Sequence, residues 1–529
     1  MTRAAFLAVT AFFAVCGPAG AQTSQIFRVV VVPGLELSDL RELESRGAVG
    51  LMVPANGPVT GRRQAIAALR RGAVENSYLG GIPPGATRID VEEAARAPAS
   101  GDVIVLGLPE GEGLDNDRRY PIAILGPGFR GLLRSDSTRI PGLVSIADIA
   151  PTALGESGAI TSEERGGAAA DALALEARIA GHRDARLPSS LAAAAVALLL
   201  AFFLRRGGVY AFAAGLLVNL GLGVAEVAGP WVATLAVGLG TVLGALGLAA
   251  VARSTIALGV LLTAVLTAYL VAMAVDPATV ALSPWGPGQA GRFYGVTNLL
   301  ETMLLVPALA GAAYLWPRFG PIGFALVAAL AFVTVAGNRF GADGGGAIVL
   351  GVAYTVLAVE LAGGGRRRLP VALAVAAAAI LILTGLDAAT GGTSHVTRAL
   401  GGGPGEIVED LGRRLEISWG QATSSWYVAL LVTMAVAALV LLALRLRSDA
   451  SRASRALPLS VAAGVITSLL VNDAPHDVAV TGLVGYLAVS VGTLAPDAPL
   501  RSPCHAPLWA RIRPRGGGLW WRGSGQSDA

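Results

Sequence analysis

The sequence contains no lysine, only two cysteines and few charged residues of either sign. Charged residues make up 14% of the 529 positions and hydrophobic residues 54%, and the mean hydropathy is +0.63. A soluble core does not hold that much apolar surface, whereas a lipid bilayer does. The composition therefore excludes an ordinary soluble protein and predicts an integral membrane protein.

The scarcity of charge and cysteine also excludes several kinds of partner and site. Arginine carries every positive side-chain charge, which a GC-rich genome explains better than a functional demand for guanidinium groups. The net charge of +4 is small and no basic stripe lies on a soluble segment, so we expect no nucleic-acid partner. Cys16 and Cys504 lie far apart in the sequence, which argues against a disulfide framework or a thiolate metal site.

Residues 1–25 are predicted to be a secretory signal peptide. Arg3 supplies a positive start, residues 4–15 form a short apolar core, and Ala19-Gly20-Ala21 is a cleavage pattern. The alternative is an uncleaved membrane anchor. In both cases the segment that follows is exported.

Residues 26–186 are the one long stretch of ordinary polarity, and they predict an extracytoplasmic α/β domain. Short β-branched runs at 27–32, 102–107 and 120–126 are typical of buried strands, and helical patterns lie near 37–46, 62–73 and 145–154. Strands that alternate with helices indicate a parallel sheet covered by helices.

Two segments of this domain carry a family resemblance. The first strand runs into Pro33-Gly34-Leu35, and the stretch from Asp148 to Leu154 has the pattern D-x-x-P-T-x-L. Both are similar to segments of the alkaline-phosphatase-like superfamily, whose active members hold two divalent metals with Asp and His, beginning directly after the first strand. Here Pro33 occupies that position, and His182 is the only histidine in the segment. The resemblance therefore implies a degenerate, non-catalytic domain with no metal and no cofactor.

Residues 187–496 are predicted to form an all-α polytopic membrane domain with about eleven transmembrane helices. The apolar runs lie near 188–204, 208–227, 231–251, 255–275, 298–316, 320–337, 345–363, 370–386, 426–445, 458–472 and 478–495. Residues 497–529 are predicted to be a disordered cytoplasmic tail.

The distribution of arginine predicts the orientation in the cytoplasmic (inner) membrane. If residues 26–186 are outside, alternate loops are cytoplasmic, and those loops carry most of the loop arginines: Arg205, Arg206, Arg253, Arg318, Arg366, Arg367, Arg368, Arg445, Arg447, Arg452 and Arg455. The positive-inside rule thus agrees with the leader.

Four polar connections, near 276–298, 337–346, 387–425 and 472–477, then lie on the outer side, and we predict that they form one polar vestibule beneath the α/β domain. The candidate acid, base and catalytic residues are His395, Asp343, Asp387 and Asp473. The candidate substrate-binding residues are Arg292, Tyr294, Asn298, Glu301, Asn338, Arg339, Arg398, Arg413 and Asn472. The alternative is four separate, solvated loops.

The order of the motifs GRFYGxxN, GADGG, SH and ND along the chain is similar to a set in uncharacterised bacterial polytopic membrane proteins that carry the same phosphatase-like domain. This second resemblance implies an architecture and no reaction. From the residues we predict a protein that binds or acts on a phosphate-containing or lipid-linked cell-envelope substrate, as an extracytoplasmic transferase or polymerase if it is an enzyme. The expected partners are membrane lipids, lipid-linked precursors or envelope proteins. A transporter or flippase and a non-catalytic envelope scaffold are the alternatives.

Overall fold

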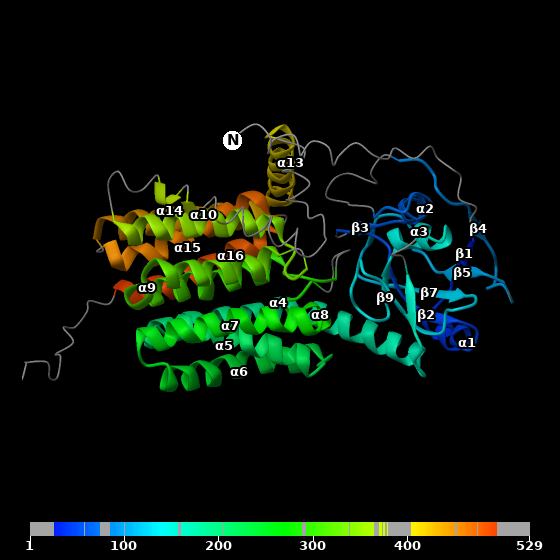
Figure 1. The fold of residues 1–529 in the computed structure, drawn as a ribbon, viewed down its shortest axis with the longest axis horizontal. Coiled ribbons are helices and arrows are strands. Elements are labelled where there is room, and N and C mark those ends of the chain that lie inside the picture. The colour runs from blue at the N-terminus through cyan, green and yellow to red at the C-terminus, as the bar shows by residue number, and fades with distance from the viewer. Residues whose placement is uncertain are drawn as a thin grey trace, which may run out of the picture.

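The computed structural model places an α/β domain at one end of a helical bundle (Figure 1). It describes residues 26–57, 59–74, 85–99, 101–156, 160–204, 206–287, 293–337, 339–363, 404–449, 452–472 and 474–494, with fragments of 370–378. Structural statements below refer to these residues.

The domain is built on an eight-stranded sheet with the order β10-β8-β2-β7-β5-β1-β4, in which β9 also pairs with β2. Its strands are β1 (Arg28–Val31), β2 (Ala48–Val53), β4 (Val91–Glu93), β5 (Val103–Leu106), β7 (Tyr120–Leu125), β8 (Gly131–Arg134), β9 (Leu143–Ser145) and β10 (Thr161–Glu163). A separate two-stranded sheet pairs β3 (Val59–Thr60) with β6 (Leu114–Asp115).

The sheet is mixed, so the prediction of a parallel sheet is wrong for two strands. β1 runs parallel to β4 and β5, and β2 runs parallel to β8 and β9. β7 is antiparallel to both of its neighbours, β2 and β5, and β10 is antiparallel to β8. A run of buried apolar residues has the same pattern in either direction, which is why the sequence did not reveal the reversal.

Both faces of the sheet are buried, and different helices pack against each face. Val29 and Val31 face a cluster that includes α2 (Arg62–Arg71) and α3 (Ile149–Ala153). Val30 faces the opposite side, where α1 (Leu40–Glu44) and the start of α4 (Ala168–Phe203) pack. Residues of the membrane half complete this second cluster, so the sheet is packed directly onto the bundle.

The bundle begins with α4, which leaves the α/β domain and continues into the membrane half without a break. The predicted domain boundary at 186/187 therefore falls inside a helix of 36 residues. The other helices are α5 (Gly207–Val224), α6 (Pro230–Val251), α7 (Thr255–Val275), α8 (Pro277–Ala281), α9 (Asn298–Ala336), α10 (Gly344–Ala362), α13 (Pro404–Ala422), α14 (Trp426–Asp449), α15 (Arg452–Val471) and α16 (Pro475–Leu494).

Helix α9 is a hairpin of two antiparallel runs. Gly320 has φ 55° and ψ −145° between Pro317 and Pro321, a conformation that interrupts the helix. The rings of Trp316 and Phe324 meet edge to face with centroids 5.9 Å apart across this turn. The two runs agree with the separate spans predicted at 298–316 and 320–337, and both of their outer ends lie beside the α/β domain.

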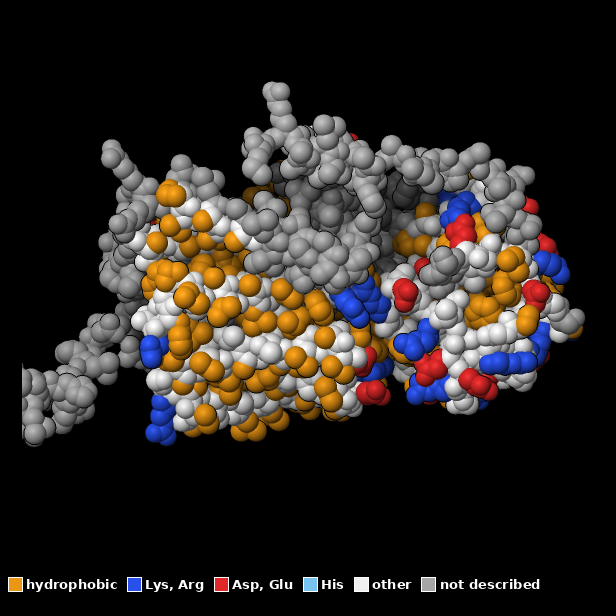
Figure 2. Space-filling model, in the orientation of Figure 1, with side chains coloured by type: hydrophobic (Ala, Val, Ile, Leu, Met, Phe, Trp, Pro, Cys, Tyr) orange, Lys and Arg blue, Asp and Glu red, His pale blue; other side chains and the backbone are white. Residues whose placement is uncertain are grey.

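Seven helices of the described chain are long and apolar enough to cross a bilayer, namely α4, α5, α6, α7, α9, α10 and α14. The apolar part of α15, Arg455–Val471, is shorter. The predicted span at 370–386 falls mostly outside the described residues. Trp231, Leu235 and Leu239 on α6 are more than 60% exposed, and Figure 2 shows apolar side chains over most of the visible face of the bundle. The protein is a multi-pass membrane protein with a small α/β domain.

Figure 2 shows arginine side chains on the α/β domain, at its junction with the bundle and at the end of the bundle farthest from the domain. There Arg206 Nη2 donates to Thr255 Oγ1 across 2.9 Å, and its guanidinium lies 5.6 Å from the ring centroid of Tyr314. These contacts bring the starts of α5 and α7 together with the middle of α9. Among the described residues, the connections that precede α5 and α7 and the turn in the middle of α9, all predicted to be cytoplasmic, thus lie at one end of the bundle.

Candidate functional site: a buried polar cluster beneath the α/β domain

The side chain of Asn472 joins two helices at the domain end of the bundle. Its Nδ2 donates to Glu301 Oε2 across 2.7 Å and to Ser468 Oγ across 2.7 Å. Glu301 lies in the first turn of α9 and is 1% exposed, and Asn472 follows the last residue of α15 and is 3% exposed. A carboxyl group and an amide thus lie buried together at the domain end of the bundle.

Asp343 brings a second carboxyl group to the same place. It caps the N-terminus of α10, where its Oδ1 accepts a hydrogen bond from the backbone of Gly346 across 2.9 Å. A Cβ at Gly345 would collide with Oδ1 of Asn472 and lie 3.3 Å from Oδ1 of Asp343, so these two groups flank one glycine.

Helix α13 supplies positive charge to this cluster. Ser418 Oγ donates to the backbone oxygen of Asn472 across 2.7 Å, which fixes α13 against the end of α15. Arg414 lies one turn before Ser418, and its Nη2 is 3.2 Å from the position that a Cβ would occupy on Gly344. Its neighbour Arg413 is exposed. We call Glu301, Asp343, Arg414 and Asn472 the polar cluster.

A second network holds the loop that leads to the polar cluster. Asn219 on α5 donates to Tyr269 Oη and Ser283 Oγ across 3.1 and 3.0 Å, and its Oδ1 accepts from the backbone of Trp285 across 3.1 Å. Thr297 Oγ1 donates to the backbone oxygen of Trp285 and accepts from the backbone of Leu300, which caps α9. The start of α9 is therefore set by a buried hydrogen-bond network.

The electrostatics of the polar cluster set it apart from ordinary bundle packing. Oε1 of Glu301 has no hydrogen-bond partner among the described residues, although it is buried. Two neighbouring carboxyl groups under apolar helices are costly unless a cation, a proton or a ligand offsets them. An energetic cost of this kind is typical of a functional site.

The α/β domain contacts the same end of the bundle through Arg139. Its Nη1 donates to the backbone oxygen of Arg339 across 2.7 Å, and its guanidinium lies 3.8 Å from the ring centroid of Tyr294. Tyr294 and Arg339 are both predicted substrate-binding residues, and the structure places them on loops just before Asn298 and Asp343. Asn298 is half-buried at the start of α9.

The structure therefore brings together part of the predicted site. Glu301, Asp343 and Asn472 meet in one buried cluster, and α13, which carries Arg413, reaches it. The remaining predicted residues lie outside the described part of the chain: Arg292, Asn338, Asp387, His395, Arg398 and Asp473. Their roles stay predictions, as do the roles assigned to the residues that meet.

Sequence reasoning missed Ser418, Ser468 and Arg139. The two serines lie on helices that show ordinary apolar or amphipathic patterns, and nothing in those patterns identifies a distant partner. Arg139 has φ 58°, a left-handed backbone conformation that is uncommon for a residue other than glycine. The sequence Ser137-Thr138-Arg139 gives no signal for it.

The motif D-x-x-P-T-x-L has a structural role in this chain. Oδ2 of Asp148 accepts from Ser135 Oγ across 2.7 Å, from Ser137 Oγ across 2.6 Å and from the backbone of Ser145 across 2.9 Å. Thr152 Oγ1 donates to the backbone oxygen of Asp148 across 2.6 Å. Asp148 thus fixes the loop before β9, and the described residues contain no group of three or more Asp, Glu, His or Cys suited to a metal ion.

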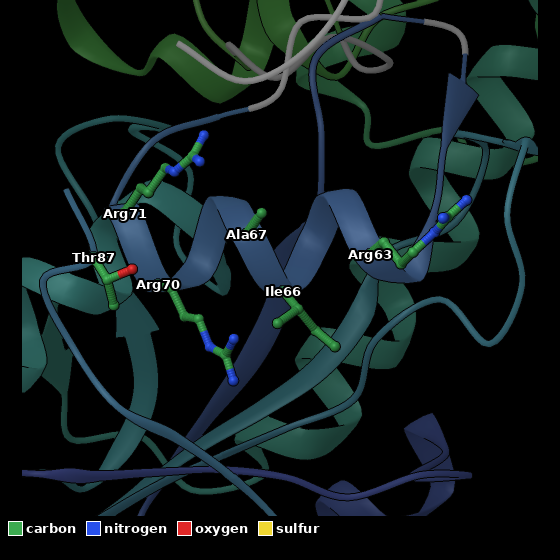
Figure 3. A pocket seen from close by; sticks show the side chains of 6 residues that line it. All are labelled: Arg63, Ile66, Ala67, Arg70, Arg71 and Thr87. Carbon is green, nitrogen blue, oxygen red and sulfur yellow. The ribbon is translucent and has the colours of Figure 1, made fainter. Parts of the chain in front are cut away.

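A cavity of about 340 Å³ on the α/β domain offers a weaker candidate site. Three arginines of α2 line it with Thr87, but Figure 3 shows the side chains of Arg63, Arg70 and Arg71 pointing in different directions. Arg63 is also paired with Glu112 at 3.2 Å. These arginines do not converge on one ligand position, so the polar cluster is the better candidate.

The chain was compared with family models, with curated proteins and with solved structures. None of the three comparisons finds a match. The argument for function therefore rests on the geometry of the polar cluster.

Proposed function

We propose that the protein binds a phosphate-bearing, lipid-linked cell-envelope substrate at the polar cluster, from the outer leaflet of the cytoplasmic membrane. The observation that carries the proposal is the contact of Asn472 with Glu301, which gathers residues of α9, α10, α13 and α15 at one bundle end.

The distribution of charge supports the outward orientation. Arg206, which contacts Thr255 and Tyr314, belongs to the end of the bundle away from the α/β domain, as the positive-inside rule requires if that domain is exported. A substrate in the outer leaflet then reaches the polar cluster laterally between helices, with its head group beneath the α/β domain.

The residue types suit a phosphate-bearing head group. A guanidinium group binds two phosphate oxygens at once, and Arg413 and Arg414 lie on the helix that touches Asn472. Glu301 and Asp343 then serve as acid and base beside the bound phosphate. In this proposal the α/β domain is a degenerate phosphatase-like module, which agrees with the structural role of Asp148.

Binding of a defined probe tests the proposal. The purified protein in nanodiscs is titrated with a polyprenyl phosphate and with the matching polyprenyl alcohol, and bound lipid is counted by native mass spectrometry. We expect selective binding of the phosphate, weakened at least tenfold in R414A and unchanged in R253A, since Arg253 lies at the opposite end of the bundle. Equal binding of phosphate and alcohol, or an unaffected R414A variant, contradicts the proposal and favours a scaffold.

A carrier is the second candidate, and the buried carboxyl pair favours it. Intramembrane carboxyl groups commonly mark ion or proton pathways in transporters. A fluorescent polyprenyl phosphate in proteoliposomes separates the two candidates, because a flippase makes the inner-leaflet label accessible to an external quencher. Binding without transbilayer movement favours an enzyme, whereas movement that E301Q abolishes favours the carrier.

A further inference from the structure

We propose that Arg139 is a positioning residue through which the α/β domain holds the two loops of the membrane site in their binding geometry. The effect of Arg139 on substrate binding rests on the proposed function, whereas its contacts with the two loops do not depend on any substrate. It gives the exported domain a task that needs no metal and no catalytic residue of its own.

Arg139 contacts both loops at once. Its hydrogen bond to the backbone oxygen of Arg339 fixes the loop that leads into α10. Its stacking at 3.8 Å on Tyr294 fixes the loop that leads into α9. A planar guanidinium makes both contacts together because it donates within its plane and stacks with its face.

The position of Arg139 is itself set firmly by the α/β domain. Asp148 accepts hydrogen bonds from Ser135 and Ser137, and the backbone of Arg139 donates to the backbone oxygen of Ser135 across 2.9 Å. Thr138 donates from its hydroxyl to the backbone oxygen of Leu143. The left-handed backbone of Arg139 is thus held by the hydrogen bonds of its own N–H group and of the residues that precede it, and it directs the side chain toward the bundle.

The two loops are joined to each other below Arg139. The backbone of Val296 donates to the oxygen of Gly341 across 2.9 Å. Gly295 has φ +89°, and a Cβ there would collide with the oxygen of Gly341, so the close approach requires glycine. Movement of one loop therefore moves the other.

Each loop ends in a residue that starts a helix of the polar cluster. Thr297 caps α9 one turn before Glu301, and Asp343 caps α10 while its own backbone donates to the oxygen of Val335 across 3.1 Å. Displacement of the loops thus changes the positions of the Glu301 and Asp343 side chains. A cavity of about 500 Å³ borders Arg139 and Pro277, so the side chain has room to leave its position.

Hydrogen exchange of the full-length protein in nanodiscs tests this inference. In R139A we expect the backbone amides of Val296, Ala342 and Asp343 to exchange about tenfold faster, the effect of losing one charge-assisted hydrogen bond. R134A is the matched control: Arg134 lines the same cavity and pairs with Glu163 at 2.9 Å, but it does not clamp these loops. R139K keeps the charge without the planar stack, so we expect exchange between those of the wild type and R139A.

The outcomes separate this inference from the proposed function. Unchanged exchange in R139A overturns the positioning role, and so does an equal increase in R134A. Faster exchange in R139A alone supports it, even if the wild type binds no polyprenyl phosphate. If the wild type does bind that lipid, R139A is expected to bind it more weakly while R134A does not.

Discussion

The side-chain amide of Asn472 donates to the carboxyl group of Glu301 across 2.7 Å, although the two residues are 171 positions apart. The bond joins the end of α15 to the start of α9 inside the bundle. Because Ser418 also donates to Asn472, the same residue anchors α13. Through its side-chain amide and its backbone oxygen, Asn472 therefore joins three helices beside a carboxyl group.

Loss of this amide is expected to destabilise the bundle. N472A leaves Oε2 of Glu301 buried without its donor, which costs about 1–3 kcal/mol of unfolding free energy. Thermal unfolding of detergent-solubilised N472A, E301A and the double variant measures the coupling between the two side chains. Strictly additive effects would show that the bond contributes nothing.

Glu301 is expected to matter for function more than for folding. E301Q keeps the shape of the side chain and removes its charge, so the protein should insert normally while substrate binding or turnover falls at least tenfold. E360Q is the matched control, because Glu360 is a half-buried carboxylate paired with Arg455 at 3.3 Å and lies near the end of α10 opposite to Asp343. If both variants lose function equally, a general electrostatic effect explains the loss and the site assignment is wrong.

The orientation can be measured by cysteine labelling. Both native cysteines are replaced by serine, and single cysteines are introduced at Ser162 in the α/β domain or at Arg253 at the opposite end of the bundle. An impermeant maleimide added to intact spheroplasts should label S162C and not R253C, and both should react after the membrane is permeabilised. The reverse pattern would contradict the exported position of residues 26–186.

Asp148 is expected to stabilise the α/β domain without any catalytic role. D148A removes an acceptor of three hydrogen bonds, one of which completes the capping box that begins at Ser145, so we expect a loss of about 2–4 kcal/mol in unfolding free energy. Limited proteolysis of the domain across a denaturant series measures this loss of stability. D136N, at an exposed neighbouring position, should behave like the wild type, and equal stability of D148A would refute the structural role.

The sequence by itself determined the multi-pass architecture, because an apolar run long enough to cross a bilayer is a property of consecutive residues. It also determined the main strands and helices of the α/β domain, whose apolar periodicity follows from which residues are buried. The break in α9 was predictable too, since Pro317, Gly320 and Pro321 interrupt the run.

Only the tertiary structure decided which residues meet. The reversed direction of β7 and the approach of Asn472 to Glu301 depend on partners distant in the chain. An apolar pattern predicts that a residue is buried, but it does not identify the residues that bury it. The contact of Arg139 with Tyr294 depends on how the α/β domain sits on the bundle. For that reason the sequence predicted the polar segments of the site, while the tertiary structure showed that Glu301, Asp343 and Asn472 form one cluster and that Arg139 reaches the loops leading to it.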